Sequence, residues 1–462
     1  MPMNTHLARF LNSRFLVALS VFLAVALVSS LSALTATSAQ RAAKPAEVDD
    51  TPSSENVEDL WLEAIDGLAS GRQRQAKKGA NALLAKQGSE AKGNWVLARL
   101  EMETGDPRAA LKQLEKIEAP ASSDAALSAE YGYALLAVGR YKDAATHAKS
   151  LSAKHASDPR GPWLEGEALW QQGNYADASP LLDTAMRLGG SLGEAKDPKN
   201  GDYDLAERYY ASGYAAYRLD NLKIALERFE SGREAHSKHA PSWIGIARLM
   251  YETNKDESAR GNYVNAVVKH GFNDNYAPAH YIGALTYFFR WKGGEGRKSL
   301  DKAIRLNRYF VEALSYRAVY FITSDQYEEG LKDADAALKV NPNSVSANAA
   351  KALWALTLSK SQEFDAIEKH VLSFNKAPGE FYQVLADGIS SRMRFADAEA
   401  IYKKGIELQP RRWSLYTGLG RAQLNQGNDE EGRKNLEIAL DNDTLRNSVF
   451  TRNLVTLLRS YD

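Results

Sequence analysis

The sequence predicts an all-α fold, an α-solenoid superhelix of about eleven helix-turn-helix repeats with a C-terminal capping helix. Three observations predict it. Small residues recur at a fixed spacing, and turn-forming residues lie between the two members of each pair of small residues. In addition, the segments YEEGLKDADAALKVNPNS and FADAEAIYKKGIELQPRR resemble each other, and the positions of their prolines, Pro342 and Pro410, differ by 410 − 342 = 68, which is twice 34.

Small residues form two series along the chain. The first series has eleven members, all Gly or Ala, and eight of its ten steps in sequence position equal 34, the others being 47 and 37. Each member of the second series lies twelve residues after a member of the first, and Phe364 is the one large residue among them. A constant period of this length is typical of stacked-repeat proteins. The first series is Ala64, Ala98, Gly132, Gly166, Gly213, Ala247, Ala284, Ala318, Ala352, Ala386 and Gly420.

The spacing has a physical explanation. Turn residues such as Gly139-Arg140-Tyr141 end one helix and begin the next. Where two helices cross closely, a side chain larger than methyl would push the axes apart, so small residues belong at the crossing. Large residues such as Leu114, Phe229 and Leu436 follow one helical turn after the second small position, on the same helical face. One helix pair cannot bury this surface alone, so neighbouring pairs must stack.

The order of small residue, turn, Tyr, small residue, aromatic and closing Pro resembles the tetratricopeptide repeat family. The best matches are GYALLAVGRYKDAATHA from Gly132, GEALWQQGNYADASPLLDTA from Gly166, and the repeat that ends in ALKVNP at Pro342. The array is expected at residues 57–445, with a surface-loop insertion at 188–204 inside the longest step and a capping helix at 446–462. Phe364 predicts that the second helix of its repeat slips in register. The resemblance implies a fold and leaves the partner open.

Residues 1–39 are predicted to be a signal peptide (or an uncleaved membrane anchor). Arg9 and Arg14 precede an apolar run over residues 15–34, and small residues follow, so that cleavage after Ala39 would suit a signal peptidase. The run is about 20 residues long, nearly enough to span a bilayer, which keeps the anchor open. Both alternatives place the rest of the chain outside the cytoplasm, in the periplasm or secreted. Residues 40–56 are small and polar and are expected to be a flexible linker.

Composition excludes several classes of function. Lys+Arg and Asp+Glu are equal at 58 each, which argues against nucleic acid as a partner, because nucleic acid is bound by clustered basic surfaces. The chain has no cysteine, which removes disulfides, thiolate metal sites, cysteine nucleophiles and a lipid-attachment cysteine. We expect no cofactor.

The sequence contains no convincing catalytic motif. The helical zinc motif H-E-x-x-H is absent, and in GGEGRKS, residues 293–299, Arg297 takes the place of the lysine that a phosphate-binding loop requires. The S-x-x-K pair Ser299 and Lys302 falls on an expected second helix, as surface residues. His236 and His239 could share a metal, but the preferred interpretation is two solvated histidines of an inter-repeat turn. We therefore expect neither a metal site nor an enzyme.

The resemblance implies that the first helix of each repeat lines the concave surface and that a partner binds there. Side chains at −6, −3, +1 and +4 from the first small position would face that groove. In the central repeats these positions are rich in aromatic residues, which often anchor interfaces. The partner-binding residues predicted in this way are Arg160, Trp163, Glu167, Trp170, Tyr210, Tyr214, Tyr217, Arg248, Tyr251, Tyr281 and Phe288, joined by Glu207, Ile244 and Leu285. The last two repeats place mostly polar residues there: Glu380, Gln383, Asp387, Ser390, Ser414, Thr417, Arg421 and Leu424.

The sequence thus predicts an exported, non-enzymatic scaffold or adaptor that binds a protein or an extended peptide in its groove, in cell-envelope assembly or secretion. The alternative is a subunit of an export machinery that handles a glycan or exopolysaccharide, in which Trp and Tyr rings would meet sugar faces. Membrane contact is expected only through the N-terminal segment, if it is not cleaved.

Overall fold

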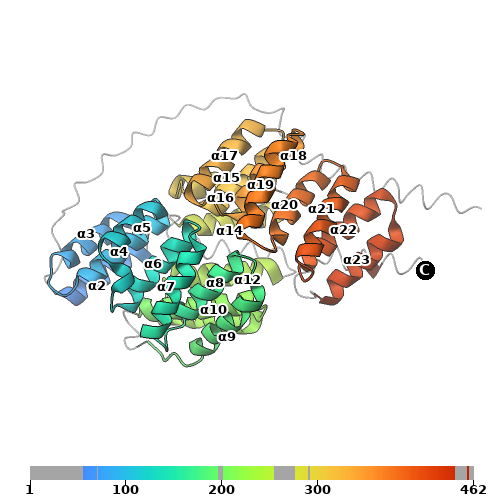
Figure 1. Ribbon diagram of the computed structural model, residues 1–462. Helices are drawn as coiled ribbons and strands as arrows, with labels where there is room; N and C mark the ends of the chain where they lie inside the picture. Colours follow the sequence, from blue (N-terminus) through green and yellow to red (C-terminus); the bar gives the residue numbers. More distant parts are fainter. Residues whose placement is uncertain are drawn as a thin grey trace, which may run out of the picture.

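The computed structural model describes residues 56–69, 71–195, 201–253, 276–289, 292–442 and 455–456. In these residues all regular structure is helical, with 21 α-helices, one short 3-10 helix and no strand. Successive helices pack as antiparallel pairs, and the pairs stack into a curved array (Figure 1). The predicted fold class is confirmed.

The helices alternate between first and second members of a repeat. The first helices are α2 (Val57–Ala69), α4 (Glu90–Thr104), α6 (Ala125–Ala137), α8 (Arg160–Gln171), α10 (Tyr203–Arg218), α12 (Ala240–Thr253), α14 (Ala277–Phe289), α16 (Val311–Thr323), α18 (Val345–Thr357), α20 (Gly379–Ser390) and α22 (Trp413–Gln426). The second helices are α3 (Gln73–Leu84), α5 (Pro107–Lys116), α7 (Tyr141–Lys154), α9 (Tyr175–Gly189), α11 (Leu222–Ala235), α15 (Gly293–Leu306), α17 (Tyr327–Val340), α19 (Ser361–Phe374), α21 (Phe395–Leu408) and α23 (Asp429–Asn442). The 3-10 helix η1 (Ala119–Ala121) precedes α6.

The small residues lie where paired helices cross. All eleven members of the first series are buried. The pair α22 and α23 shows why they must be small, because a Cβ on Gly420 would lie 2.7 Å from the carbonyl oxygen of Gly432. The larger residues predicted to fill the surrounding groove, Leu114, Phe229 and Leu436, are buried as well. The backbones of paired helices therefore touch directly, and the neighbouring side chains seal the contact.

The predicted register slip at Phe364 is wrong. Helices α17, α19, α21 and α23 begin at residues 327, 361, 395 and 429, which keeps the period of the small residues. Phe364 keeps the place of a small residue and is half-buried, and Val371 is the one buried residue of α19. A large side chain at the crossing is therefore accommodated by burying less of the helix, while the period is kept.

The described part of the insertion packs against the array. After α9 ends at Gly189, the Tyr209 hydroxyl of α10 donates hydrogen bonds to the carbonyl oxygens of Leu192 (2.9 Å) and Gly193 (3.0 Å). Leu192 and Ala195 cover buried apolar residues of α10. This part of the predicted loop lies on the surface of α10; residues 196–200 lie outside the described residues.

Several predicted segments lie outside the described residues. They are the signal segment at 1–39, the linker at 40–55 and the capping helix apart from residues 455–456, where Val455 is buried. Within the part of the chain that the structure describes, no helix combines the length and the apolar character that a membrane crossing requires.

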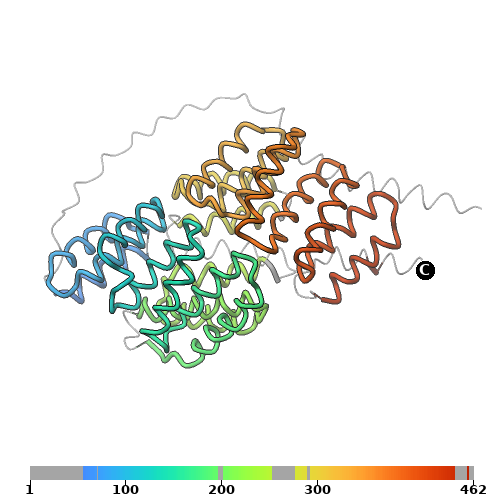
Figure 2. The backbone as a smooth tube through the Cα atoms, viewed as in Figure 1, coloured from blue at the N-terminus to red at the C-terminus, as the bar shows by residue number. Residues whose placement is uncertain are grey.

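The array curves until its later repeats lie beside its earlier ones. We call α2–α12 the amino-terminal layer and α14–α23 the carboxyl-terminal layer; Figure 2 shows the first in blue to green and the second in yellow to red. Hydrogen bonds join turns of one layer to loops of the other, between residues that are far apart in the sequence. We call this line of contacts the seam.

The seam repeats with the period of the sequence. Asn307, Asn341 and Asn375 each follow a second helix of the carboxyl-terminal layer, at intervals of one full repeat. The Oδ1 atom of each accepts from the backbone N–H two positions ahead, at 2.9 Å in all three cases. This local turn fixes the side-chain amide so that its Nδ2 points away and can donate across the seam.

The acceptors of the seam belong to the turns of the amino-terminal layer. Asn307 Nδ2 donates to the carbonyl oxygen of Glu103 (3.0 Å), and Asn375 Nδ2 donates to that of Gln171 (3.0 Å). We call each such contact of one turn with one loop a rung. In the rung between these two, Asn341 Nδ2 donates to the Tyr141 hydroxyl (3.3 Å). Three successive turns of one layer thus meet three successive loops of the other.

Glycine makes this approach possible. Gly139 and Gly173, at the turns of the second and third rungs, have φ of +77° and +71°, in the left-handed region that suits glycine. A Cβ on Gly173 would also lie 2.6 Å from the backbone nitrogen of Ala377 in the opposite loop. The ladder of described hydrogen bonds stops after this third rung. In the next repeat Gln409 replaces the Asn, and its Oε1 lies against Gly379 in its own layer.

We expect Asn375→Ala to loosen the seam without unfolding the helices, because it removes a hydrogen bond between layers and the local turn that orients it. A hydrogen bond contributes about 1 kcal/mol, so the amide of Lys376, which donates to Gln172 O across the seam, should exchange about fivefold faster with solvent. Hydrogen exchange measured by NMR or mass spectrometry checks this. The control is Asn425→Ala, whose side chain donates to the Arg421 carbonyl oxygen of its own helix and, among the described residues, does not reach the seam. Equal protection of residue 376 in both variants would contradict the role of the seam.

Candidate functional site

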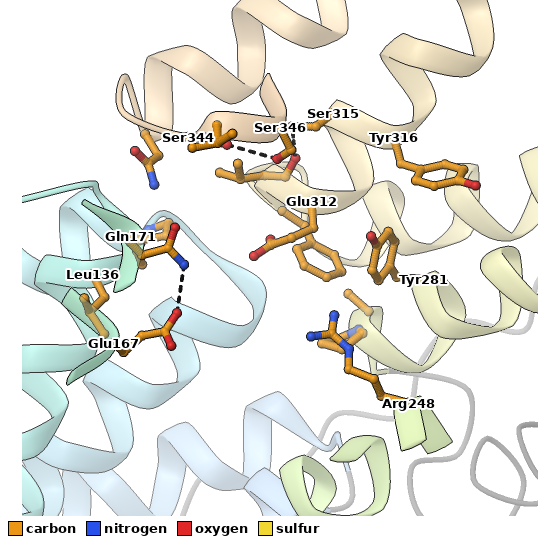
Figure 3. A pocket seen from close by; sticks show the side chains of 18 of the residues that line it. Leu136, Glu167, Gln171, Arg248, Tyr281, Glu312, Ser315, Tyr316, Ser344 and Ser346 are labelled. Atoms are coloured by element: carbon orange, nitrogen blue, oxygen red, sulfur yellow. Dashed lines mark hydrogen bonds between the residues drawn. The ribbon is translucent and has the colours of Figure 1, made fainter. Parts of the chain in front are cut away.

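A cavity of about 860 Å³ lies inside the superhelix, between the two layers. Every first helix from α4 to α20 contributes to its wall, and the loops of the seam close one side. Figure 3 shows this central cavity: Glu167 and Gln171 lie on one wall, and Arg248, Tyr281 and Glu312 approach from the other. The first helices from α4 to α20 therefore line the cavity, as the resemblance to tetratricopeptide repeats implied.

Aromatic rings form much of the wall. Nine tyrosines line the central cavity. Trp163 stands edge-on to Tyr133 (5.4 Å between ring centroids) and to Tyr214 (6.0 Å), and Tyr281 stands edge-on to Phe310 (5.5 Å). Rings packed in this way hold one another in fixed positions, so the wall is a rigid surface with a polar hydroxyl on most of its rings.

The innermost end of the cavity holds a buried charge cluster. Arg99 of α4 forms ion pairs with Glu130 of α6 and Glu207 of α10, both at 3.0 Å. Glu207 also accepts a hydrogen bond from His239 Nε2 at 3.0 Å. One guanidinium group therefore ties three first helices together at the centre of the amino-terminal layer. A buried charge is tolerated only when it is paired in this way.

The environment sets the protonation states of the cluster. Burial would raise the pKa of Glu207, but the nearby Arg99 and the hydrogen bond from His239 lower that pKa to about 2. Burial raises the pKa of Glu130 to about 7 and that of Glu103 to about 8. Since three carboxyl groups share one guanidinium, Glu207 carries the negative charge and Glu103 keeps a proton at neutral pH.

The interpretation of His236 and His239 as solvated histidines is wrong. Both are buried, and His239 is 0% exposed. A carboxylate only accepts, so His239 donates through Nε2 to Glu207, and its Nδ1 accepts from the Ser242 hydroxyl at 2.8 Å. Burial lowers the pKa of both histidines. Both are structural residues, and no group of three or more metal-binding side chains occurs among the described residues.

A second hollow, the outer cleft, has a volume of about 1310 Å³ and opens where the seam stops. It lies between the end of α8 and the α10–α11 turn on one side and the α21–α22 loop and α22 on the other. Arg218, Gln383, Asp387 and Arg412 line both hollows, so the outer cleft continues into the central cavity.

The predicted groove residues divide between these hollows. The central cavity contains Trp163, Glu167, Glu207, Tyr210, Tyr214, Arg248, Tyr251, Tyr281, Leu285, Glu380, Gln383 and Asp387. The outer cleft contains Trp170, Tyr217, Ser414, Thr417 and Arg421, with Gln383 and Asp387 shared. Ile244, Ser390 and Leu424 line neither hollow. The contact of these residues with a partner stays a prediction.

Arg160 and Phe288 also line neither hollow and have structural surroundings. Arg160 is 2% exposed and forms ion pairs with Asp158 (2.6 Å) and with Asp204 (2.7 Å), which link α8 to α10. Phe288 packs against Tyr316 and Tyr320 of the following repeat. The register predicted that these two side chains face the groove, but they contact the neighbouring repeat instead.

Several lining residues were missed, although the same register finds most of them. Applied to the repeats of Ala98, Gly132 and Ala318, the +1 and −6 positions give Arg99, Tyr133 and Glu312, all of which line the cavity. The loop residues Asn307, Tyr309, Asn341 and Ser344 had no such signal. They reach the cavity only because the superhelix returns over itself.

Comparison with known proteins agrees with this architecture. Residues 130–191 and 392–445 match the sequence model described as tetratricopeptide repeat. Tetratricopeptide repeats are present in this chain. The fold mediates protein–protein interaction and is typically non-catalytic. No curated protein sequence matches the chain.

Three solved structures are among those that resemble this chain. Yeast Tom70 is 14% identical, with a TM-score of 0.40 over 88% of this chain and 96% of that one. A tetratricopeptide repeat protein from Parabacteroides merdae is 17% identical, with a TM-score of 0.37 over 55% of this chain and 98% of that one. A chain of the APC/C hetero-tetramer Cut9-Hcn1 is 12% identical, with a TM-score of 0.34 over 87% and 96%. At such identities the likeness concerns the fold alone.

Glu103 should make the stability of the protein depend on pH. Its native pKa of about 8 lies above the ordinary value of 4.5. Between these values the native state holds a proton that the unfolded state has lost, so the free energy of unfolding falls as pH rises from 4.5 through 8. We expect Glu103→Gln to match the wild type at pH 5 and to be more stable at pH 9, as measured by urea unfolding. Exposed Glu227→Gln is the control; the same pH dependence in both variants would contradict the assignment.

Proposed function

We propose that the chain is a non-enzymatic scaffold or adaptor that holds an extended polypeptide segment in the central cavity. The observation that carries this proposal is the continuity of the two hollows through Arg218, Gln383, Asp387 and Arg412. A volume of about 860 Å³ alone would also suit a small molecule. A long path that stays open where the seam ends fits a chain better than a compact ligand.

The lining supports a polypeptide. It combines tyrosine rings with six carboxyl groups and four guanidinium groups. Glu312 and Glu380 are exposed within the cavity and form no ion pair with any described residue. Fixed rings give apolar contact at low entropic cost, and the free carboxyl groups can meet backbone N–H groups or side chains of a partner.

The glycan alternative, a subunit that handles an exopolysaccharide, has less support. Sugars bind on the flat faces of aromatic rings, whereas Trp163 is packed between Tyr133 and Tyr214 and is only 7% exposed. Tyr281 is likewise engaged by Phe310. We keep the glycan as an outcome of the experiment below.

We also propose that the protein is exported and works in the periplasm or outside the cell, in envelope assembly or secretion. The support is the order of Arg9 and Arg14, the apolar run at 15–34 and the small residues up to Ala39. Mass spectrometry of the N-terminus after expression in a bacterial host tests this. We expect a mature chain that starts at Gln40 in the periplasmic fraction. An intact N-terminus in the soluble cytoplasmic fraction would contradict export.

The groove is tested with peptides selected on the wild-type protein from a random library displayed on phage. Glu312→Arg and Glu380→Arg place a large, oppositely charged side chain in the cavity at positions that are exposed, so folding should be kept. We expect either variant to weaken binding of the selected peptides at least about tenfold, or about 1.4 kcal/mol, in fluorescence anisotropy.

The matched control is Glu230→Arg, which makes the same change at an exposed position of α11 outside both hollows. Equal affinity of the cavity variants and the control would reject the cavity as the binding site. If no peptide binds and a panel of oligosaccharides does, with loss in Glu312→Arg, the glycan alternative replaces the proposal.

A further inference from the structure

The outer cleft lies where the ladder of the seam ends. Up to the third rung, an asparagine of the carboxyl-terminal layer donates to a turn of the amino-terminal layer. In the next repeat Asp220 takes the place of Gly139 and Gly173 in the turn, and Gln409 takes the place of the asparagine in the loop. The α10–α11 turn and the α21–α22 loop both line the outer cleft at this position.

The lining of this cleft is basic. Arg218, Arg411, Arg412 and Arg421 face two acidic residues, Asp220 and Asp387. The charge of Arg218 is already neutralised by Glu167, to which it donates at 2.6 and 2.8 Å. Arg412 donates to the neutral amide of Gln383 at 2.8 Å. Arg411 is exposed and forms no ion pair with any described residue.

The acidic residues of the cleft are fewer than the basic ones. Burial raises the pKa of Asp387, the nearby Arg421 and Arg412 oppose that rise, and its carboxyl group accepts a hydrogen bond from the Tyr402 hydroxyl. Aromatic rings stand beside the basic groups: Trp170 and Tyr175 are edge-on to each other at 4.6 Å, and Trp413 borders the same cleft. Half-buried rings with an excess of guanidinium groups fit a chain that carries carboxylates.

We propose that the outer cleft binds an acidic stretch of the polypeptide whose neighbouring part lies in the central cavity. The proposal rests on the proposed function for the continuity of the bound chain, but Arg411 and Arg421 line the cleft alone. The cavity is lined by six carboxyl groups against four guanidinium groups, and the cleft by four guanidinium groups against two carboxyl groups. This difference gives a bound segment a direction, with its acidic part at the open end.

The test uses fluorescein-labelled oligoglutamate, oligoglutamine and oligolysine peptides of equal length. We expect oligoglutamate to bind most tightly and its affinity to fall as salt is raised, because the cleft is open to solvent. Arg411→Gln combined with Arg421→Gln should weaken oligoglutamate binding about tenfold. The control combines Arg74→Gln with Lys77→Gln, which removes the same charge from exposed positions of α3.

The outcomes separate the cleft from the cavity. The oligoglutamate test uses none of the cavity variants, so a failed cavity test would not affect the cleft. Equal loss in the cleft and α3 variants would mean attraction by net charge and would overturn the proposal. Equal binding of the three peptides would overturn it as well, as would binding of an oligouronate but not of oligoglutamate. Circular dichroism of each variant confirms that loss of binding is not loss of fold.

Discussion

Direct contact between the backbones of paired helices is the constraint on which the rest of this structure depends. At Gly420 and Gly432 no side chain fits between α22 and α23. Helices in such contact have little freedom in their crossing, so each repeat is rotated against its neighbour by nearly the same amount. Constant rotation makes a superhelix, and a superhelix of this length returns over its own start. The seam and the central cavity both follow from that return.

The seam turns a local sequence feature into a long-range contact. The Asn that follows α15, α17 and α19 accepts within its own loop through Oδ1 and presents Nδ2 to the other layer. The Asn therefore serves folding of the repeat and closure of the superhelix at once. Because the Asn side chain is also held by its own loop, the contact between layers orders few additional groups, and its entropic cost is small. Glycine at positions 139 and 173 supplies the matching recess.

Most of the fold could be predicted from the sequence, because the period of small residues acts within one repeat and its neighbour. The same register places Arg99, Tyr133 and Glu312 in the cavity. It fails for Arg160 and Phe288, where the inward position serves the contact between repeats. It also fails for His239, since its burial depends on Glu207, which belongs to the preceding repeat. The seam residues could not be found, because their partners are set by the pitch of the whole superhelix.

The end of the ladder shows how single positions of the repeat shape the site. At the place of Gly139 and Gly173 the α10–α11 turn has Asp220, and at the place of the seam asparagines the α21–α22 loop has Gln409. Asp220 keeps the left-handed backbone, with a φ of +62°, but carries a side chain where glycine leaves a recess. The Gln409 Oε1 lies against Gly379 in its own layer. The outer cleft lies between these two segments, and Arg411 and Arg412 of the loop line it.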